Sequence, residues 1–243
     1  MKAVLTIAGR EIKRYFVSPM AYAVAAVLYL ALGLLFYRVM SVGMVTRQIL
    51  PDGRMLLQTL TLLLLFITPA ISMRLLAEEK GSGTIELLQT TPVSDSAIIL
   101  GKWLGAWIYM LGLLSVTLVY PILLHRVTYP GIDFGQLAAA YLGLFLMVGA
   151  MLAIGVCVSA LFRHQLAAFI THLGILQVLW VSGELVRRPG ISADVLQYLN
   201  FVNHYYDNSF QGIVSLSDVF YFVSLIIFSL ILGTLILAWG RWR

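Results

Sequence analysis

Six stretches of the sequence contain no Lys, Arg, Asp or Glu, and they limit the possible folds more than any other feature. Each covers between 18 and 29 residues. An apolar α-helix crosses the hydrocarbon core of a bilayer in about 20 residues, and one charge at its centre costs about 3 kcal/mol. Six transmembrane helices are therefore predicted, at residues 20–37, 55–73, 103–124, 134–162, 165–183 and 219–240.

The charge content of the chain agrees with this interpretation. Charged residues make up 11% of the sequence, against about 25% in a typical soluble domain, and all of them lie in the connecting segments. An open sheet cannot satisfy its backbone hydrogen bonds in lipid. The stretches are also too long and too continuously apolar to be strands of a barrel. We expect an all-α membrane protein in which residues 1–243 form a single transmembrane domain, with no soluble domain.

The distribution of Lys and Arg predicts the orientation. If both termini lie in the cytoplasm, ten of the 16 basic residues fall on the cytoplasmic side, in agreement with the positive-inside rule. The formal net charge of +5 then lies on that side too, which suits an anionic inner leaflet better than nucleic acid. Cys157 is the single cysteine, so no internal disulfide is expected. We expect a multi-pass protein of the cytoplasmic (inner) membrane, in contact with membrane lipid and not with nucleic acid.

Residues 1–17 have the pattern of a basic amphipathic helix. Val4, Ala8 and Ile12 share its apolar face at helical spacing. The opposite face carries Lys2, Arg10, Lys13 and Arg14. Such a helix lies in the membrane surface, and Pro19 then breaks it before the first span. It serves either as a simple anchor or as a helix that also contacts a cytoplasmic partner.

The hydrophilic stretch that follows the second predicted span is EEKGSGTIELLQTTPVSDS, at residues 78–96. Gly81 and Gly83 provide the backbone freedom to end the second span and turn. A short cytoplasmic helix is predicted at residues 84–91, capped by Thr84 and stopped before Pro92. Its apolar side chains are Ile85, Leu87 and Leu88. This apolar knob packs either in a groove on another protein or on the ends of the chain's own spans.

Polar residues within the spans and the outer loop offer few candidates for chemistry. His172 lies inside a predicted span and is a candidate for a functional site, together with Gln177 as a pathway residue. The alternative for His172 is packing between helices with a hydrogen bond to a carbonyl. His204 and Asp207 have metal-ligand spacing, but two ligands do not make a site. No phosphate-binding loop and no paired catalytic residues are found, so we expect neither an enzyme nor a metal site.

The outer segment 184–218 is the longest watery part of the chain. Apolar residues recur at helical spacing at Val195, Leu199, Val202 and Tyr206, with polar residues between them. This pattern predicts a helix or a broken helix that dips toward the outer leaflet.

The segment RLLAEEKGSGTIELLQTTPVS, residues 74–94, resembles a known motif. It is similar to the E-x-x-x-G-T-x-E-x-L-x-x-x-P-V-S pattern of ABC-2 type permeases, which are membrane subunits of ABC transporters. The closing GIVSLSDV segment, residues 212–219, is also similar to that family. The order of an amphipathic elbow helix and six spans resembles the compact branch that includes gliding-motility and nitrous-oxide-reductase-maturation permeases.

The resemblance implies roles for particular residues. Helix 84–91 would be the coupling helix that docks into an ATPase subunit, with the elbow helix beside it. The interface residues implied are Glu78, Glu79, Gly83, Thr84, Ile85, Glu86, Leu87, Leu88, Pro92 and Val93, with Glu11, Lys13 and Arg14 on the elbow helix. The outer segment would form part of an external gate, and its gate residues would be Leu199, Val202, Tyr205, Tyr206 and Phe210.

The resemblance also implies a function. The chain would be the non-catalytic permease subunit of an ATP-driven exporter, with a pair of separate ATPase subunits that bind ATP and Mg²⁺. The second permease would be another copy or a sibling chain, and an extracytoplasmic accessory protein would be a further partner. No cofactor is expected in this chain. The alternative is an energy transducer that moves an extracytoplasmic partner without transporting a solute. An ion channel or secondary transporter is disfavoured because no span contains a charged residue.

Overall fold

Helices form all the regular structure in the part of the chain that the computed structural model describes, which is residues 2–46, 53–85, 93–127, 131–182 and 198–240. The predicted all-α class is therefore confirmed. In chain order the elements are α1 (Lys2–Val17), α2 (Pro19–Thr46), α3 (Gly53–Ser72), α4 (Ala77–Gly81), α6 (Asp95–Thr117), α7 (Val119–Val127), α8 (Phe134–Leu161), α9 (Gln165–Val181), α11 (Phe201–Tyr206), a 3-10 turn (Ser209–Gln211) and α12 (Leu216–Gly240).

Five helical segments are long and apolar enough to cross a membrane. Their bounds are Pro19–Ser41, Arg54–Gly81, Asp95–Val127, Phe134–Leu161 and Leu216–Gly240. Each contains one of the predicted spans or nearly all of it. The predicted span 165–183 corresponds to α9, whose 17 residues extend about 26 Å at 1.5 Å per residue, slightly less than a typical hydrocarbon core.

The third predicted span differs in detail from the structure. A proline such as Pro121 ordinarily ends a helix at the residue before it. Instead the helix is interrupted at Leu118 and resumes as α7, which runs to Val127 with Pro121 in its first turn. Proline is tolerated there because the first backbone N–H groups of a helix have no intrahelical acceptor. The break therefore precedes the proline instead of following it.

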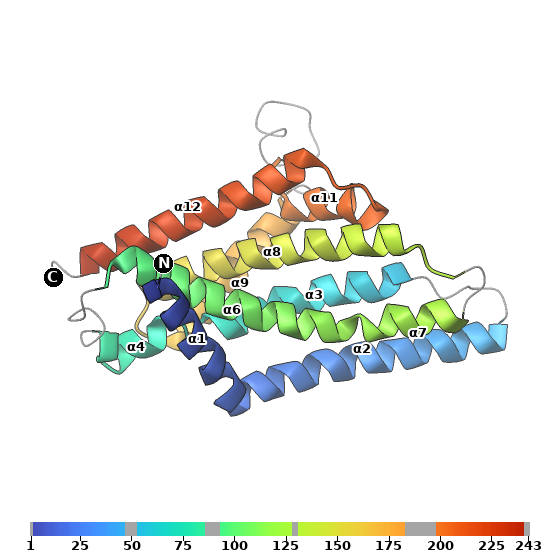
Figure 1. Cartoon of the computed structure of the whole chain (residues 1–243), viewed down its shortest axis with the longest axis horizontal. Helices are drawn as coiled ribbons and strands as arrows, with labels where there is room; N and C mark the ends of the chain where they lie inside the picture. Colours follow the sequence, from blue (N-terminus) through green and yellow to red (C-terminus); the bar gives the residue numbers. More distant parts are fainter. Residues whose placement is uncertain (1, 47–52, 86–92, 128–130, 183–197, 241–243) are drawn as a thin grey trace.

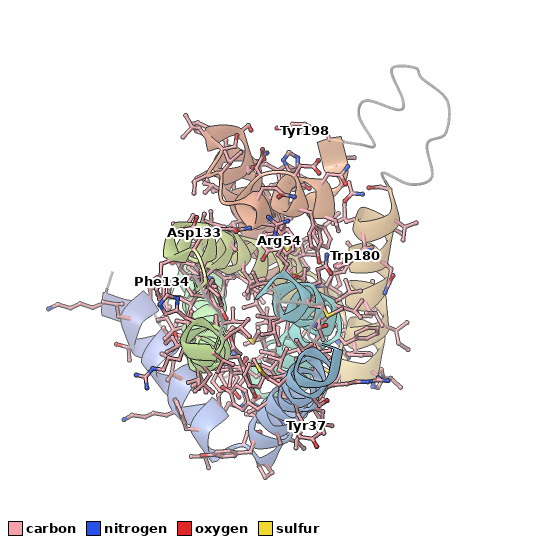
Figure 2. All side chains as sticks on the ribbon, turned by 90° about the vertical axis from the view of Figure 1, so that its right-hand side faces the viewer. Tyr37, Arg54, Asp133, Phe134, Trp180 and Tyr198 are labelled. Atoms are coloured by element: carbon pink, nitrogen blue, oxygen red, sulfur yellow. The ribbon has the colours of Figure 1, made fainter. Side chains whose placement is uncertain are left out.

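The long helices run side by side along the molecule, and α1 crosses the bundle near one end (Figure 1). That end also carries α4 and the last turn of α12, whereas α11 lies toward the other end. Figure 2 looks onto this second end, where Arg54, Asp133 and Tyr198 are found. Helices α1 and α4 therefore lie at the same end of the bundle.

Helix α8 is the centre of the bundle and contacts α3, α6, α9 and α12. Small residues allow these close approaches, as is typical of packed membrane helices. A methyl group added at Gly155 would clash with Ser72 of α3, and one added at Gly143 would clash with Ser209 beneath the outer segment. By contrast, α2 lies at the edge and buries little more than one face.

Helix α1 packs onto α6 across two glycines that are one turn apart. A Cβ atom at Gly101 would lie 2.7 Å from the Cβ of Ile7, and one at Gly105 would lie 2.7 Å from the Cβ of Glu11. Ala8 and Glu11 are buried in this contact, while the basic residues of α1 are exposed. The elbow helix is therefore fastened to a span along one face.

Candidate functional site

The helix is interrupted between α3 and α4, and one hydroxyl group from another helix bonds to the backbone groups of this break. The backbone N–H groups of Leu76 and Ala77 both donate to the Ser159 hydroxyl oxygen at 3.0 Å. The same hydroxyl donates to the Met73 carbonyl at 3.2 Å. Ser159 belongs to α8 and is fully buried. One side chain thus satisfies three backbone groups that the break leaves without helical partners.

This break lies earlier than the sequence indicated. The predicted second span covered residues 55–73, and its helix was expected to end and turn only at Gly81 and Gly83. The structure ends α3 at Ser72 and places α4 before the two glycines. Pro69 has already removed one hydrogen bond from the last turns of α3. Gly83 does adopt the left-handed conformation expected of it, with φ of +73°.

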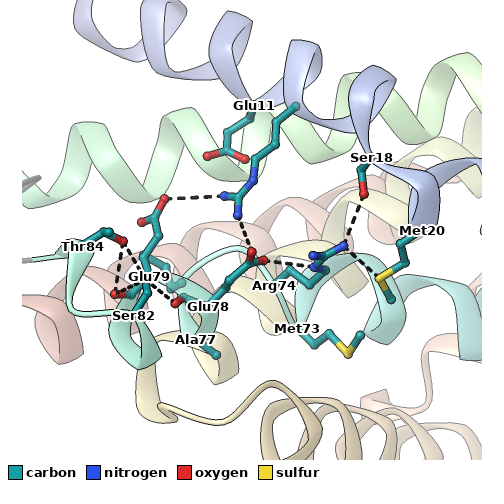
Figure 3. A network of polar contacts seen from close by, with 12 residues as sticks. Glu11, Ser18, Met20, Met73, Arg74, Ala77, Glu78, Glu79, Ser82 and Thr84 are labelled. Atoms are coloured by element: carbon teal, nitrogen blue, oxygen red, sulfur yellow. Dashed lines mark hydrogen bonds and ion pairs between the residues drawn. The ribbon is translucent and has the colours of Figure 1, made fainter.

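Two glutamates on α4 turn back toward the bundle. Glu78 forms ion pairs with Arg14 of α1 and with Arg74, both at 3.0 Å. Glu79 lies 2.7 Å from the ammonium group of Lys102 on α6 and 3.7 Å from Arg14. These contacts join α4 to α1 and to α6, as Figure 3 shows for the part around α4.

Lys102 is the centre of the network. Its ammonium group also donates to Glu11 of α1 at 2.8 Å, and its side chain is 0% exposed. Three acids and three bases meet here, so the formal charges cancel. We call this set the ionic cluster; its members are Glu11, Arg14, Arg74, Glu78, Glu79 and Lys102.

Burial makes the cluster energetically important. An ion removed from water costs several kcal/mol, and only well-placed partners recover that cost, so loss of one partner from a buried pair destabilises by about 3–5 kcal/mol. The second Glu79 carboxylate oxygen, Oε2, is buried without a hydrogen-bond partner among the described residues. Nearby on α1, burial raises the pKa of Tyr15, and the charge of Glu11 adds to this effect. The cluster therefore favours one arrangement of α1, α4 and α6.

Arg74 extends the cluster to the junction of α1 and α2. Its guanidinium donates to the Ser18 hydroxyl at 3.3 Å and contacts the Met20 sulfur at 3.2 Å (Figure 3). On the other side of α4, the Lys80 ammonium group donates to the Ala160 carbonyl at the end of α8. Helix α4 is thus held by α1, α6 and α8 together.

The structure divides the predicted coupling residues into two groups. Glu11 and Glu79 are buried and bind Lys102. The exposed residues are Lys13, Arg14, Gly83 and Thr84. Ile85 and Val93 pack partly on the chain's own core. Glu86, Leu87, Leu88, Pro92 and the rest of helix 84–91 lie outside the described residues.

Lys102 and Ser159 are the two residues of this site that the sequence did not single out. Lys102 directly precedes the uncharged stretch 103–124, a position that is typical of a charged residue in a connecting loop. A signal was present, because Lys102 has apolar residues for a full turn on either side. Ser159 had no comparable signal, since a serine within a span ordinarily bonds to its own helix.

His172 and Gln177 lie on different faces of α9. His172 is buried, and its Nδ1 lies 2.8 Å from the Ser72 hydroxyl oxygen just above the helix break. Its Nε2 has no partner among the described residues. Gln177 is partly exposed and lies about 140° around α9 from His172 at helical spacing. His172 therefore packs between helices, with a serine in place of the expected carbonyl.

The described part of the outer segment is a broken helix, as predicted. Helix α11 is capped by Asn200, whose side-chain oxygen accepts the N–H groups of Val202 and Asn203. Tyr205 and Phe210 are buried against the bundle, while Leu199 is 41% exposed. Val202 and Tyr206 are partly exposed. The predicted segment 184–218 also includes residues up to 197, which lie outside the described part.

His204 pairs with a different acid from the one its spacing suggested. Its Nδ1 lies 2.8 Å from the Asp218 carboxylate, which also accepts the Asn208 amide at 2.9 Å. Asp218 is buried at the start of α12, and Asp207 is exposed. In the described part of the chain no three His, Cys, Asp or Glu side chains are grouped so that they could hold a metal ion. The pair thus joins α11 to α12.

Comparison with known proteins agrees with the motif and with this architecture. Residues 5–243 match the family described as ABC-2 family transporter protein. No curated protein matches the chain. The match covers nearly all of the sequence, including the elbow helix, the ionic cluster and the outer segment. The chain therefore belongs to the ABC-2 transporter family and is a membrane protein of that family.

Proposed function

We propose that this chain is the permease subunit of an ATP-driven exporter and that α4 carries the motion of a separate ATPase subunit into the spans. The observation that supports this most is the ionic cluster. It ties the helix immediately before the predicted coupling segment to α1 and to α6. A segment that merely linked two spans would not need a buried lysine shared by two carboxylates.

The assembly follows from the family. ABC-2 permeases work with ABC ATPase subunits, so this chain needs no catalytic residues of its own. We propose two ATPase subunits that bind ATP and Mg²⁺, and a second permease that is either another copy or a sibling. The end with α1 and α4 faces the cytoplasm of the inner membrane in this proposal. An extracytoplasmic accessory protein would contact the opposite end.

The described residues have distinct roles in this mechanism. Gly83 and Thr84 are exposed and contact the ATPase subunit, with Lys13 of α1 beside them. Glu79, Glu11 and Lys102 do not touch the ATPase; they position α4 relative to α1 and α6. The hydroxyl of Ser159 holds the break about which α4 can turn.

The coupling obeys a simple requirement. Nucleotide must bind one arrangement of the complex better than another, or no motion follows. When the ATPase subunits close, they displace the coupling segment and α4 with it. Because the ionic cluster is buried and electrically neutral, α1 and α6 move with α4 instead of separating from it. At the far end, Leu199, Val202 and Tyr206 form the accessible part of the gate, and Tyr205 and Phe210 anchor it on the bundle.

Crosslinking tests the proposed contact directly. In a Cys157→Ala background, Thr84→Cys places one thiol on the exposed turn after α4, and Ser217→Cys places one at the opposite end as a control. In the purified permease–ATPase complex, we expect Thr84→Cys to crosslink to the ATPase subunit, with a yield that changes when ATP is added. Ser217→Cys should not crosslink. A crosslink from Ser217→Cys and none from Thr84→Cys would show that the ATPase subunit binds the opposite end of the bundle, which would contradict the proposal.

Vesicle transport distinguishes the exporter from the energy transducer. Sealed vesicles that contain the complex should accumulate or release a solute in an ATP-dependent manner if the chain is an exporter. ATP-dependent Thr84 crosslinking without any solute movement would instead support an energy transducer that acts on an extracytoplasmic partner.

A further inference from the structure

An open cavity of about 460 Å³ lies beside α4, on the side away from the ionic cluster. It is lined by α4 and the turn after it, by the α8–α9 turn and by the end of α12. Leu161, Arg163 and Gly240 each stand at the end of a span. Spans end where the hydrocarbon gives way to headgroups, so the cavity lies at the depth of lipid phosphates.

The described lining carries positive charge and no acidic residue. Lys80 and Arg163 both line the cavity, and its described lining includes no Asp or Glu. Lys80 is held in place through its bond to the Ala160 carbonyl. Arg163 is exposed and forms no ion pair with any described residue. The polar part of the cavity therefore suits an anion.

The remaining wall is apolar. Ile85, Leu161 and Leu237 line the cavity together with the cations. Leu161 is 56% exposed, so this apolar wall opens toward lipid at the end of α8. A free phosphate ion would gain no binding energy from the apolar wall, whereas an anionic amphiphile would contact both the cations and the apolar wall.

We propose that the cavity binds the phosphate headgroup of an anionic phospholipid from the leaflet at this end of the bundle. Basic pockets between transmembrane helices bind acidic headgroups, and the volume lies within the range of sites for molecules of this size. The acyl chains lie against Leu161 and extend from there into the leaflet. Because Lys80 belongs to α4, the bound lipid also restrains the helix that carries Glu78 and Glu79.

Native mass spectrometry of the delipidated full-length chain tests this site. The probes are palmitoyl-oleoyl phosphatidylglycerol and the matching phosphatidylcholine, added separately. We expect the wild-type chain to bind the phosphatidylglycerol about tenfold more tightly. The Lys80→Gln/Arg163→Gln double variant should lose this preference, and Arg163→Gln alone should weaken it. Lys80→Arg keeps the charge and should retain the preference.

The control is Arg126→Gln, which removes one exposed charge from α7 at the other end of the bundle. It should leave the preference for phosphatidylglycerol unchanged. The single Arg163 variant remains informative if the double variant unfolds, since Arg163 has no described ion pair to lose. An equal loss in the Arg126 and Arg163 variants, or full preference in the folded double variant, would overturn the proposal.

Two further arms separate the lipid from other anions. Inorganic phosphate at the concentration of the lipid should not displace phosphatidylglycerol; if it does, the site takes a soluble anion and the lipid assignment is wrong. If Arg163→Gln weakens capture of the ATPase subunit while lipid preference stays intact, the cavity belongs to a protein interface. These measurements do not depend on transport, so their failure would leave the proposed function standing.

Discussion

The two ends of the bundle fasten their short helices by different means. At one end, α4 is held by the ionic cluster, whose members come from distant parts of the chain. At the other end, α11 is held by buried aromatic rings, a side-chain cap and the His204–Asp218 pair. Apolar packing loses contacts steadily as surfaces separate, whereas a buried ion that loses its partner is heavily penalised.

This difference indicates how the two ends respond to force. Displacement of α4 alone would leave Lys102, Glu11 or Glu79 without a partner in a dry environment. The ions therefore favour joint movement of α1, α4 and α6. At the other end, Tyr205, Tyr206 and Phe210 contact one another edge to face, an arrangement that can repack in small steps. In the proposed mechanism, the end with α4 transmits motion from the ATPase subunit, and the end with α11 closes the pathway.

Removal of the central cation should produce the largest effect. Lys102→Met leaves the carboxylates of Glu11 and Glu79 buried together, and we expect it to lower the free energy of unfolding by about 3–5 kcal/mol. The measurement is the thermal unfolding midpoint of the purified chain. The triple variant Glu11→Gln/Glu79→Gln/Lys102→Met removes all three charges and should recover most of that loss.

The triple variant also tests whether the ionic cluster carries motion from α4 to α1 and α6. If the ions carry motion, it should be stable and bind the ATPase subunit, yet hydrolyse ATP with little transport. Wild-type transport by this variant would show that the cluster is only a structural support. A Lys102→Met chain as stable as wild type would contradict the buried geometry.

The α1–α6 contact should show the next largest effect. Gly101→Ala places a methyl group 2.7 Å from the Ile7 Cβ and 3.0 Å from the Val4 carbonyl oxygen, and overpacking of this kind costs about 1–3 kcal/mol. Gly112→Ala is the matched control in the same helix, because nothing lies within 4 Å of its added methyl group. We expect a lower unfolding midpoint for Gly101→Ala and an equal or higher one for Gly112→Ala. Equal destabilisation by both would mean that α1 does not rest on α6.

Loss of the hydroxyl at the helix break should be smaller but more specific. Ser159→Ala leaves the buried N–H groups of Leu76 and Ala77 without an acceptor, at a cost of about 1–3 kcal/mol. We expect reduced transport for each ATP hydrolysed, measured in vesicles with the ATPase subunit present. Ser115→Ala is the control, because that exposed hydroxyl only bonds to Leu111 in its own helix. Identical coupling in both variants would remove Ser159 from the mechanism.

The sequence predicted the spans well because a charge-free stretch is a local property. It also predicted a turn at Gly83, which depends on a few neighbouring residues and where the structure has a positive φ. The limits of helices were less accurate. The end of α3 at Ser72 depends on a hydroxyl from α8, and no pattern within the second span contains that information.

The candidate site was only partly predictable for the same reason. The motif located Glu78 and Glu79, yet their partners are far along the chain: Lys102 follows Glu79 by 23 residues and Glu11 precedes Lys102 by 91. The resemblance placed both glutamates at the interface with the ATPase subunit. Tertiary packing instead directs Glu79 inward, because Lys102 is buried and requires a carboxylate there.

The opposite end of the bundle should respond least. Asp218→Asn keeps the shape of the side chain but replaces one of its two carboxylate oxygens with an NH₂ group. One of the two bonds, to His204 or to the Asn208 amide, is then lost. Hydrogen bonds to a charged group contribute about 1.5–3 kcal/mol, and an amide that keeps one of the two bonds should lose about 1–2 kcal/mol. The unfolding midpoint should fall modestly, while ATP-dependent crosslinking through Thr84→Cys stays unchanged.

Tyr221→Phe, which removes only the bond to the Leu199 carbonyl, should likewise leave the crosslink unchanged and lower the unfolding midpoint by a smaller amount. If either variant abolished the Thr84 crosslink, the two ends would be coupled more tightly than their different construction implies, and the outer segment would itself be part of the transmitter.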